Sequence, residues 1–307
     1  MQIGVHDSIA FSFDPERIAA FLESHGHQCT VLEAGDSVAG EGYDCVVTFG
    51  HEDALLDAPW VHCIRAGVDA FPFDRYAETE TALTHSPGIH ATTIGETVLG
   101  MVLSFARRLH RYRDRQHANN WEIEPYDATF TVQDETVCVV GLGTLGEGVA
   151  LRADALGMTV RGVRREPKPV PGVDELFRPD ELHDAVAGAR FVVLCVPLTE
   201  DTEAMIDADV FAAMDEDAYL INVARGGVVA EDALLDALDG DEIAGAGLDA
   251  HAEEPLPADS PLWGYDDVII TPHVGALSNT YHESVGKLVV ANAERRENGE
   301  SLSDRVV

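Results

Sequence analysis

The sequence predicts an α/β protein of two domains, each built on a parallel sheet. Short apolar runs alternate with helical patterns along most of the 307 residues, as strands and helices do in such sheets. A Gly-x-Gly-x-x-Gly turn at 141–146 directly follows an apolar run and directly precedes a helical pattern. The length suits two domains with separate cores. We therefore expect a Rossmann dinucleotide-binding domain around the turn and a smaller, flavodoxin-like substrate domain.

The substrate domain is predicted to comprise residues 1–86 and 277–307. Strands are expected at 3–5, 28–32, 44–49 and 61–65, and the clearest helix at 15–24, with a proline in its first turn. The His-Ser-Pro-Gly cluster at 85–88 predicts the domain boundary. A final helix at 280–297 could return to this domain and make it discontinuous.

The dinucleotide-binding domain is predicted to span residues 87–276. It begins with a long helix at 93–113, which could belong to a subunit interface, followed by an irregular stretch at 121–130. Six strands, matched to the Rossmann order 3-2-1-4-5-6, are expected at 136–140, 159–163, 191–196, 219–223, 245–249 and 268–271.

Each glycine of the turn has a predicted task in dinucleotide binding. Gly141 permits the tight turn, Gly143 lets a pyrophosphate approach the backbone, and Gly146 lets the helix pack on the strand. The helix begins at Thr144 and Leu145 and ends before a glycine at 157, and its first amides favour phosphate. The alternative is an ordinary glycine-rich turn.

Two arginines indicate the cofactor. Dinucleotide sites that bind NAD(H) carry an acidic residue at the end of the second strand, where it binds the ribose 2′-hydroxyl. This sequence has Arg164 and Arg165 there, and guanidinium groups bind phosphate in two-pronged fashion. We therefore predict that NADP(H) is preferred, with NAD(H) possible as a second cofactor. Alternatively, both arginines simply face solvent.

Acidic residues dominate the composition. The chain has 55 Asp and Glu against 20 Lys and Arg, a net charge of −35, and the acids are spread along its length. Such charge repels nucleic acid and anionic membranes, so neither is expected as a partner. Halophilic proteins tolerate this self-repulsion. The hypothesis is a halophilic, cytoplasmic protein.

Cysteine usage and hydropathy agree with that location. The five cysteines contain no Cys-x-x-Cys pair and lie in or beside apolar runs, which predicts neither a disulfide framework nor a metal site. The first residues read as a strand and not as a leader, and no run approaches about 20 apolar residues. We expect a soluble intracellular protein.

Polar side chains follow the last three predicted strands of the second domain. Arg225, Asp249 with Glu254 close behind, and His273 stand just past these strand ends. Neighbouring parallel strands would bring them together at the cofactor crevice. Arg225 could bind a substrate carboxylate, His273 could exchange the hydroxyl proton, and Glu254 could hold the other imidazole nitrogen. Taken singly, each of these residues is more often an ordinary structural or surface residue, and it is their shared edge that favours the catalytic interpretation of the set.

These motifs together resemble the D-isomer-specific 2-hydroxyacid dehydrogenases. The resemblance spans nearly the whole chain and is carried by Gly-Leu-Gly-Thr-Leu-Gly at 141–146, Val-Pro-Leu-Thr at 196–199, Asn-Val-Ala-Arg-Gly-Gly at 222–227, Leu-Asp at 248–249, Glu-Pro at 254–255 and Thr-Pro-His at 271–273. It implies a homodimer with its active site in the cleft between the domains. It also implies Arg225, Glu254 and His273 as the catalytic set. Arg164 departs from the family's usual aspartate, in agreement with NADP(H).

The resemblance also implies binding residues. The amides of Gly67 and Val68, in a turn after the strand at 61–65, are expected to bind the substrate carboxylate together with Arg225, although a purely structural turn is an equal reading of those residues alone. The cofactor is expected to contact the glycine turn, the two arginines, and Val196, Pro197, Thr202, Val223, Ala224, Asp249, His273 and Gly275.

The predicted function is NAD(P)-dependent, reversible conversion of a 2-keto acid to a D-2-hydroxy acid. One alternative is glyoxylate or hydroxypyruvate reduction within the same family. Another is a non-catalytic, NADP-sensing interaction protein. All three polar residues of the catalytic set are present, which favours catalysis.

Overall fold

The computed structural model describes residues 1–166 and 168–307. The chain divides into two compact units, Met1–His90 with Leu277–Val307, and Ala91–Ala276. The sequence predicted the first domain boundary between residues 86 and 87, four residues before the boundary at 90/91 in the structure. It predicted the second boundary between residues 276 and 277, where the structure also has it. The first unit is therefore discontinuous in sequence.

The first unit is built on a five-stranded parallel sheet with the order β2-β1-β3-β4-β5, the order of flavodoxin-like folds. Its strands are β1 (Gln2–His6), β2 (Gln28–Leu32), β3 (Cys45–Thr48), β4 (Trp60–Cys63) and β5 (Ala82–Thr84). Four of them were predicted within two residues at each end, whereas β5 was not predicted. Residues 305–307 run antiparallel beside β5.

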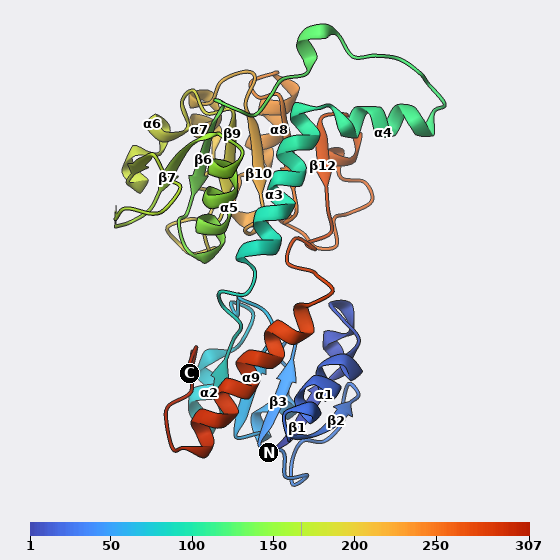
Figure 1. Cartoon of the computed structure of the whole chain (residues 1–307), viewed down its shortest axis with the longest axis vertical. Coiled ribbons are helices and arrows are strands. Elements are labelled where there is room, and N and C mark those ends of the chain that lie inside the picture. Colours follow the sequence, from blue (N-terminus) through green and yellow to red (C-terminus); the bar gives the residue numbers. More distant parts are fainter. Residues whose placement is uncertain (167) are drawn as a thin grey trace. The chain divides into compact units, whose positions relative to one another are not determined.

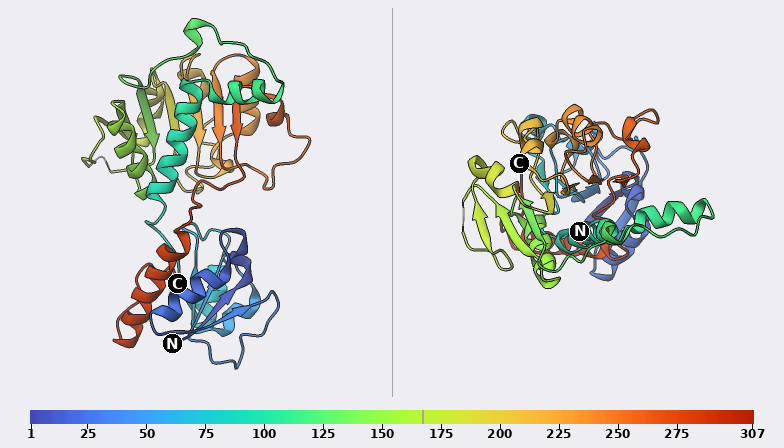
Figure 2. Two further views of the ribbon diagram at one scale, coloured as in Figure 1. Left: turned by 45° about the vertical axis from the view of Figure 1, so that its right-hand side comes forward. Right: turned by 90° about the horizontal axis from the view of Figure 1, so that it is seen from above.

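Helices α1 (Pro15–Ser24) and α9 (Tyr281–Glu297) lie side by side on one face of this sheet (Figures 1 and 2). The Asp14 carboxylate accepts a hydrogen bond from the Glu16 amide at the start of α1. A β-carbon added to Gly286 would lie 2.3 Å from the Phe21 ring, so this glycine allows the two helices to pack closely. The other face packs against the short helix α2 (Phe73–Thr79) and the 3-10 turn at Asp53–Asp57.

The second unit contains a seven-stranded parallel sheet with the order β12-β11-β10-β9-β6-β7-β8. The strands are β6 (Thr136–Val140), β7 (Thr159–Val163), β8 (Glu175–Phe177), β9 (Phe191–Leu194), β10 (Tyr219–Asn222), β11 (Gly245–Leu248) and β12 (Val268–Ile270). Numbered within the unit, this is the Rossmann order 3-2-1-4-5-6 with a seventh strand at the edge.

The predicted count of six strands was wrong because β8 was missed. The strand β9, taken from the sequence as the third, is in fact the fourth and pairs with β6. β8 has only three residues, lies at the sheet edge and is partly exposed, so it lacks the apolar run of a central strand. The last three strands were nevertheless assigned as neighbours correctly, since β10, β11 and β12 are adjacent.

Helices cover both faces of the second sheet. α3 (Ala91–Ala106) and α5 (Thr144–Ala155) pack on one face, and α6 (Leu182–Val186), α7 (Ala208–Ala213) and α8 (Glu231–Asp239) on the other. As predicted, α5 ends before Gly157, which has a φ of +76°. A β-carbon at Gly148 would lie 2.3 Å from the Ala91 carbonyl oxygen, which explains the close contact of α5 and α3.

The single helix predicted at 93–113 is wrong: it forms two helices, α3 and α4 (Leu109–His117). Between them Arg108 has a φ of +53°, in the left-handed region that ends a helix. Its guanidinium donates to the Ala128 carbonyl and to the Asp267 carboxylate, and these contacts hold the bend. α4 and the segment after it project from the sheet of this unit (Figure 1).

Candidate active site

The glycine turn between β6 and α5 has the geometry of a dinucleotide site. Gly141 has a φ of +98°, which favours glycine, and a β-carbon at Gly146 would lie 2.0 Å from the Gly141 carbonyl oxygen. A β-carbon at Gly143 would meet no atom of the described residues within 4 Å, so the backbone there is open to a ligand. Gly143 also caps α5 without a side chain that could occupy the first amides. The turn therefore fits a pyrophosphate.

Arg164 and Arg165 begin directly after β7, beside the glycine turn. The Gly141 amide donates to the Val163 carbonyl at 2.9 Å, so the turn and the end of β7 are joined. Arg164 is half-buried and Arg165 is exposed. Glu166, the next acidic residue, lies 2.6 Å from the Lys168 ammonium group. The two arginines therefore follow the strand that pairs with β6, which leads into the glycine turn.

The loop after β9 lies against the same turn. A β-carbon at Gly141 would lie 2.7 Å from a methyl group of Val196, so that side chain packs on the glycine. The Thr202 hydroxyl donates to the Pro197 carbonyl at 2.6 Å and accepts from the Thr199 amide at 2.8 Å. Thr202 thus closes the loop by its own hydrogen bonds.

His273 and Glu254 form a direct pair. The imidazole Nδ1 lies 2.9 Å from Oε1 and 3.0 Å from Oε2 of the carboxylate. Burial raises the pKa of Glu254, but hydrogen bonds from the His251 amide and from His273 outweigh it, so the pKa lies below its ordinary value. An ionised carboxylate only accepts hydrogen bonds, so Nδ1 carries a proton and donates it to Glu254.

Asp249 shapes the loop that carries His273. Its buried carboxylate accepts hydrogen bonds from the Thr271 hydroxyl at 2.6 Å and from the Val274 and Gly275 amides at 2.9 Å each. These contacts flank His273, whose φ of +54° is rare outside glycine and costs about 1–3 kcal/mol. The carboxylate therefore stabilises an otherwise unfavourable backbone at the histidine.

The loop that carries Arg225 is held by Asn222. The Asn222 side chain donates to the Arg225 carbonyl at 3.0 Å and accepts from the Ala224 amide at 3.0 Å. The Asp249 amide in turn donates to the Asn222 carbonyl at 2.9 Å. Val223 and Ala224 are buried, whereas Arg225 is partly exposed. Asn222 thus fixes the arginine loop to the next strand end.

His251 connects the remaining loops. Its amide donates to Glu254 Oε1 at 3.1 Å, and its Nε2 lies 3.1 Å from the Thr271 carbonyl. A β-carbon at Gly226 would lie 1.9 Å from the His251 carbonyl carbon, so only glycine fits beside Arg225. Arg225, Glu254 and His273 therefore lie on three interlocked loops at adjacent strand ends.

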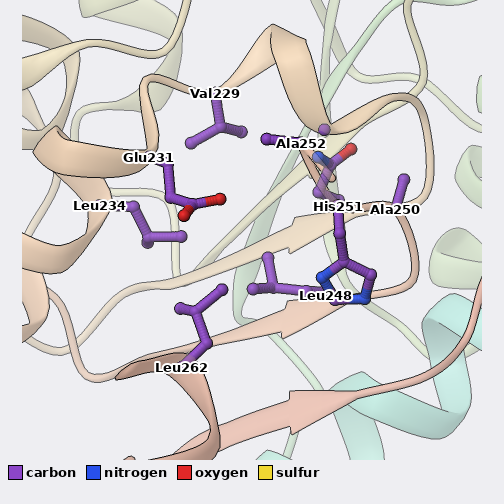
Figure 3. Close-up of a pocket in the computed structure, with 10 residues that line it drawn as sticks. Val229, Glu231, Leu234, Leu248, Ala250, His251, Ala252 and Leu262 are labelled. Atoms are coloured by element: carbon purple, nitrogen blue, oxygen red, sulfur yellow. The ribbon is translucent and has the colours of Figure 1, made fainter. Parts of the chain in front are cut away.

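A small pocket borders these loops (Figure 3). Figure 3 shows the His251 ring beside Leu248, and the other lining side chains include Val229, Leu234 and Leu262. These apolar residues belong to the core on the α8 side of the sheet. Loop residues such as Gly226 and Ala252 also line the pocket, whereas Arg225, Glu254 and His273 do not belong to the described lining.

Gly67 and Val68 lie in the first unit, in the turn after β4, and both are half-buried. The Val68 carbonyl accepts from the Phe71 amide at 2.9 Å. His85 Nδ1 lies 2.6 Å from the carbonyl oxygen of Ala66, directly before Gly67. Hydrogen bonds to the Ala66 and Val68 carbonyl groups therefore hold this turn.

Sequence reasoning missed several residues that position the catalytic candidates. Asn222, His251 and Thr271 had no predicted role, and Asp249, predicted as a cofactor contact only, also binds the His273 loop through its carboxylate. The signal for Asn222 was available: an amide at a buried strand end directly before Val-Ala-Arg. In the described part of the chain, no cluster of three His, Cys, Asp or Glu residues is arranged for a metal ion. Nor does that part contain a helix long and apolar enough to span a membrane.

The sheet order and the glycine turn define a Rossmann dinucleotide-binding protein, and the His–Glu pair at its strand ends is suited to proton transfer. The sequence model for the NAD-binding domain of D-isomer specific 2-hydroxyacid dehydrogenases matches residues 99–275. The chain belongs to this family. It is an oxidoreductase that acts on CH–OH donors with NAD(P) as acceptor.

Named relatives agree with this assignment. The chain is 33% identical over 267 residues to glyoxylate/hydroxypyruvate reductase B of Yersinia enterocolitica, covering 86% of this chain and 81% of the relative. A D-isomer specific 2-hydroxyacid dehydrogenase from Xanthobacter autotrophicus, solved with NADPH and MES, is 28% identical with a TM-score of 0.82, covering 100% and 98% of the two chains. D-lactate dehydrogenase of Lactobacillus jensenii, solved with NAD+, is 25% identical with a TM-score of 0.84 over 100% of both chains.

Proposed function

We propose that this protein reduces a small 2-keto acid to the D-2-hydroxy acid with NADPH, reversibly. The observation that carries the proposal is the His273–Glu254 pair, held with Arg225 on three interlocked loops at adjacent strand ends. When bound, the reduced nicotinamide supplies the hydride for C2 of the keto acid. The protein must then supply a proton and bind the carboxylate.

In this proposal His273 is the acid and base. Glu254 accepts a hydrogen bond from Nδ1, which fixes the tautomer and the orientation of the ring. Nε2 of the imidazolium donates its proton to the C2 oxygen during reduction and takes it back in the oxidative direction. Oxygen protonation and reduction at C2 together convert the carbonyl group into a hydroxyl group.

Arg225 and the amides of Gly67 and Val68 are proposed to bind the substrate carboxylate. A guanidinium is a planar donor that matches a carboxylate and also polarises a neighbouring C2 oxygen. Asn222 sets the backbone of Arg225, so the donor would be oriented before substrate binds. Backbone amides in a turn add donors that need no reorientation.

NADP(H) is the proposed cofactor. The glycine turn 141–146 and the first amides of α5 would hold the pyrophosphate, while Arg164 and Arg165 would hold the 2′-phosphate. The residues proposed to line the rest of the cofactor are Val196, Pro197, Thr202, Val223, Ala224, Asp249, His273 and Gly275. The NADPH named with the Xanthobacter enzyme supports this choice.

A homodimer is proposed, with α4 and the segment after it at the interface. This segment exposes Trp121 and Tyr126 almost completely, at 99% and 100%. Residues 107–115 also hold five arginines in a chain of net charge −35, and three of them, Arg108, Arg111 and Arg115, form ion pairs within the chain. A second copy would offer both apolar area and an acidic surface to this basic segment.

The net charge of −35 supports the proposal of a cytoplasmic protein adapted to high salt.

Two alternatives follow from particular observations. The relatives named glyoxylate/hydroxypyruvate reductase B suggest these two keto acids as substrates. A non-catalytic NADP-sensing protein would need only the glycine turn and the arginines, and the intact His273–Glu254 pair favours catalysis over it.

The test is a steady-state assay of purified protein in molar salt. NADPH should be oxidised when glyoxylate, hydroxypyruvate, pyruvate or longer 2-keto acids are added, and chiral chromatography should identify the D product. NADPH binding without turnover on any keto acid would instead support the sensing protein.

A further inference from the structure

We propose that His85 is a positioning residue that presents the Gly67 amide to the substrate carboxylate. This inference rests on the proposed function, in which that amide is a substrate ligand. The imidazole itself stays on the opposite side of the backbone. The contacts that lead to this assignment all lie within the first unit.

Four consecutive carbonyl groups before Gly67 are bound from outside the turn. The Ser86 hydroxyl donates to the Cys63 carbonyl at 3.1 Å, and the Tyr281 hydroxyl to the Ile64 carbonyl at 2.7 Å. The Ser86 amide donates to the Arg65 carbonyl at 3.0 Å, and His85 Nδ1 donates to the Ala66 carbonyl at 2.6 Å. Every carbonyl from residue 63 to residue 66 therefore has a defined direction.

These directions also fix the amides. In a trans peptide the carbonyl oxygen and the following N–H point to opposite sides. Among the described residues the cis peptide bond is Glu254–Pro255, so the Ala66–Gly67 peptide is trans. Because the Ala66 carbonyl points at His85, the Gly67 N–H points away from it. The hydrogen bond to the carbonyl also polarises the peptide and makes its N–H a stronger donor.

His85 is well placed for this task. A carbonyl only accepts hydrogen bonds, so Nδ1 of His85 carries the proton and donates it. The His85 backbone amide donates to the Asp304 carbonyl at 3.2 Å, and the residue follows β5 directly. The imidazole is thus attached to a strand and to the C-terminal segment, and not to the turn that it orients.

The neighbouring polar contacts form one buried chain. The Ser86 hydroxyl donates to Cys63, so it accepts from His62 Nε2 at 3.0 Å. His62 Nδ1 then accepts from the Thr84 hydroxyl at 2.8 Å, and Thr84 accepts from the Trp60 indole at 2.7 Å. Burial lowers the pKa of His62 to about 3, so the chain keeps one arrangement at neutral pH.

The experiment compares His85→Asn with His85→Leu. Asparagine places an amide N–H near the position of Nδ1, and leucine has the same size without a donor. Since one hydrogen bond changes here, His85→Leu should raise the KM of the best 2-keto acid and weaken binding of oxamate, an unreactive analogue, by about 10-fold. His85→Asn should recover most of the loss. The KM for NADPH should stay unchanged, and the ¹⁵N–¹H resonance of Gly67 should shift in the leucine variant alone.

Tyr281→Phe is the matched control. It removes the donor to the Ile64 carbonyl, whose peptide carries the Arg65 amide, and that amide is already directed at Cys63 Sγ at 3.4 Å. The melting temperature should fall, while the KM for the keto acid stays within about two-fold. A KM unchanged by His85→Leu, or raised equally by Tyr281→Phe, would overturn the positioning role. If His85→Leu does not fold, His85→Ala replaces it in the same comparison. Absence of any wild-type turnover would contradict the proposed function instead.

Discussion

Nδ1 of His273 lies almost equally far from the two carboxylate oxygens of Glu254, at 2.9 and 3.0 Å. Such a symmetric contact restricts rotation of the imidazole and places a full negative charge beside it. The carboxylate is itself held by the His251 amide. The direction of the His273 ring therefore depends on Glu254.

Glu254→Gln should lower kcat/KM for keto-acid reduction by about 10- to 100-fold, because a neutral amide holds the imidazole by a weaker hydrogen bond than a carboxylate does. Steady-state kinetics with the best keto acid measure the effect. His273→Ala should cost more, about 10²- to 10⁴-fold, with NADPH affinity retained. A kcat/KM of Glu254→Gln equal to that of the wild type would contradict the pairing role.

Arg164→Asp should exchange the cofactor preference. A carboxylate at the end of β7 repels a 2′-phosphate and accepts from a ribose 2′-hydroxyl, so the KM for NADPH should rise about 10- to 100-fold while that for NADH falls. Steady-state kinetics with both cofactors measure the ratio. Arg296→Asp, on α9, makes the same charge change and should leave the ratio alone. An unchanged ratio in Arg164→Asp would reject the phosphate contact.

Asp249→Asn should loosen the loop that carries His273. The new side-chain amide can no longer accept from the Thr271 hydroxyl and both backbone amides together. We expect the free energy of unfolding to fall by about 1–3 kcal/mol and kcat to fall with it. Denaturant titration and kinetics test this. The exposed Asp259→Asn serves as the control and should match the wild type in both assays.

Acid should destabilise the fold before its carboxylates are protonated. Burial lowers the pKa of His62 to about 3 and that of His90 to about 4, whereas both would titrate near 6.5 when unfolded. Between the folded and unfolded pKa values, the unfolded state binds more protons than the folded state. The stability that each neutral, buried histidine contributes is therefore fully present above pH 6.5 and is lost as the pH falls. Each histidine adds a slope of up to about 1.4 kcal/mol per pH unit. His62→Gln should reduce the slope measured by denaturant titration between pH 4 and 6.

Salt should stabilise the protein strongly. A net charge of −35 repels itself across the surface, and the screening length falls from about 10 Å at 0.1 M to about 3 Å at 1 M salt. We expect calorimetry to give a higher melting temperature in molar KCl than at low salt. A higher melting temperature at low salt would refute adaptation to high salt.

The sheet architecture could be predicted wherever strands are central. β6, β9 and β10 have apolar runs because both of their faces are covered by helices. β5 and β8 are edge strands of three residues that were missed, whereas β12 has the same length at the opposite edge of its sheet and was predicted because Val268–Ile270 is entirely apolar. The bend at Arg108 depends on contacts with residues 128 and 267, which local sequence does not encode.

The candidate site could be predicted in part for a similar reason. Strand neighbours follow from topology, so Arg225, Glu254 and His273 were correctly expected at the ends of adjacent strands. The contacts that hold them could not be inferred. Nothing in the sequence around Asp249 indicates that its carboxylate accepts three hydrogen bonds. His85 is one of 13 histidines, and no sequence pattern distinguishes it from the others. Such partners follow only from backbone positions in three dimensions.

The discontinuity of the first unit affects how the chain is made. Translation delivers all of Ala91–Ala276 before α9 and the segment that pairs with β5 leave the ribosome. Until then, one apolar face of the first sheet is covered by α1 but lacks the second helix that packs on it. The nucleotide-binding unit can reach its native state during synthesis, whereas its companion must wait in a partly open, aggregation-prone form.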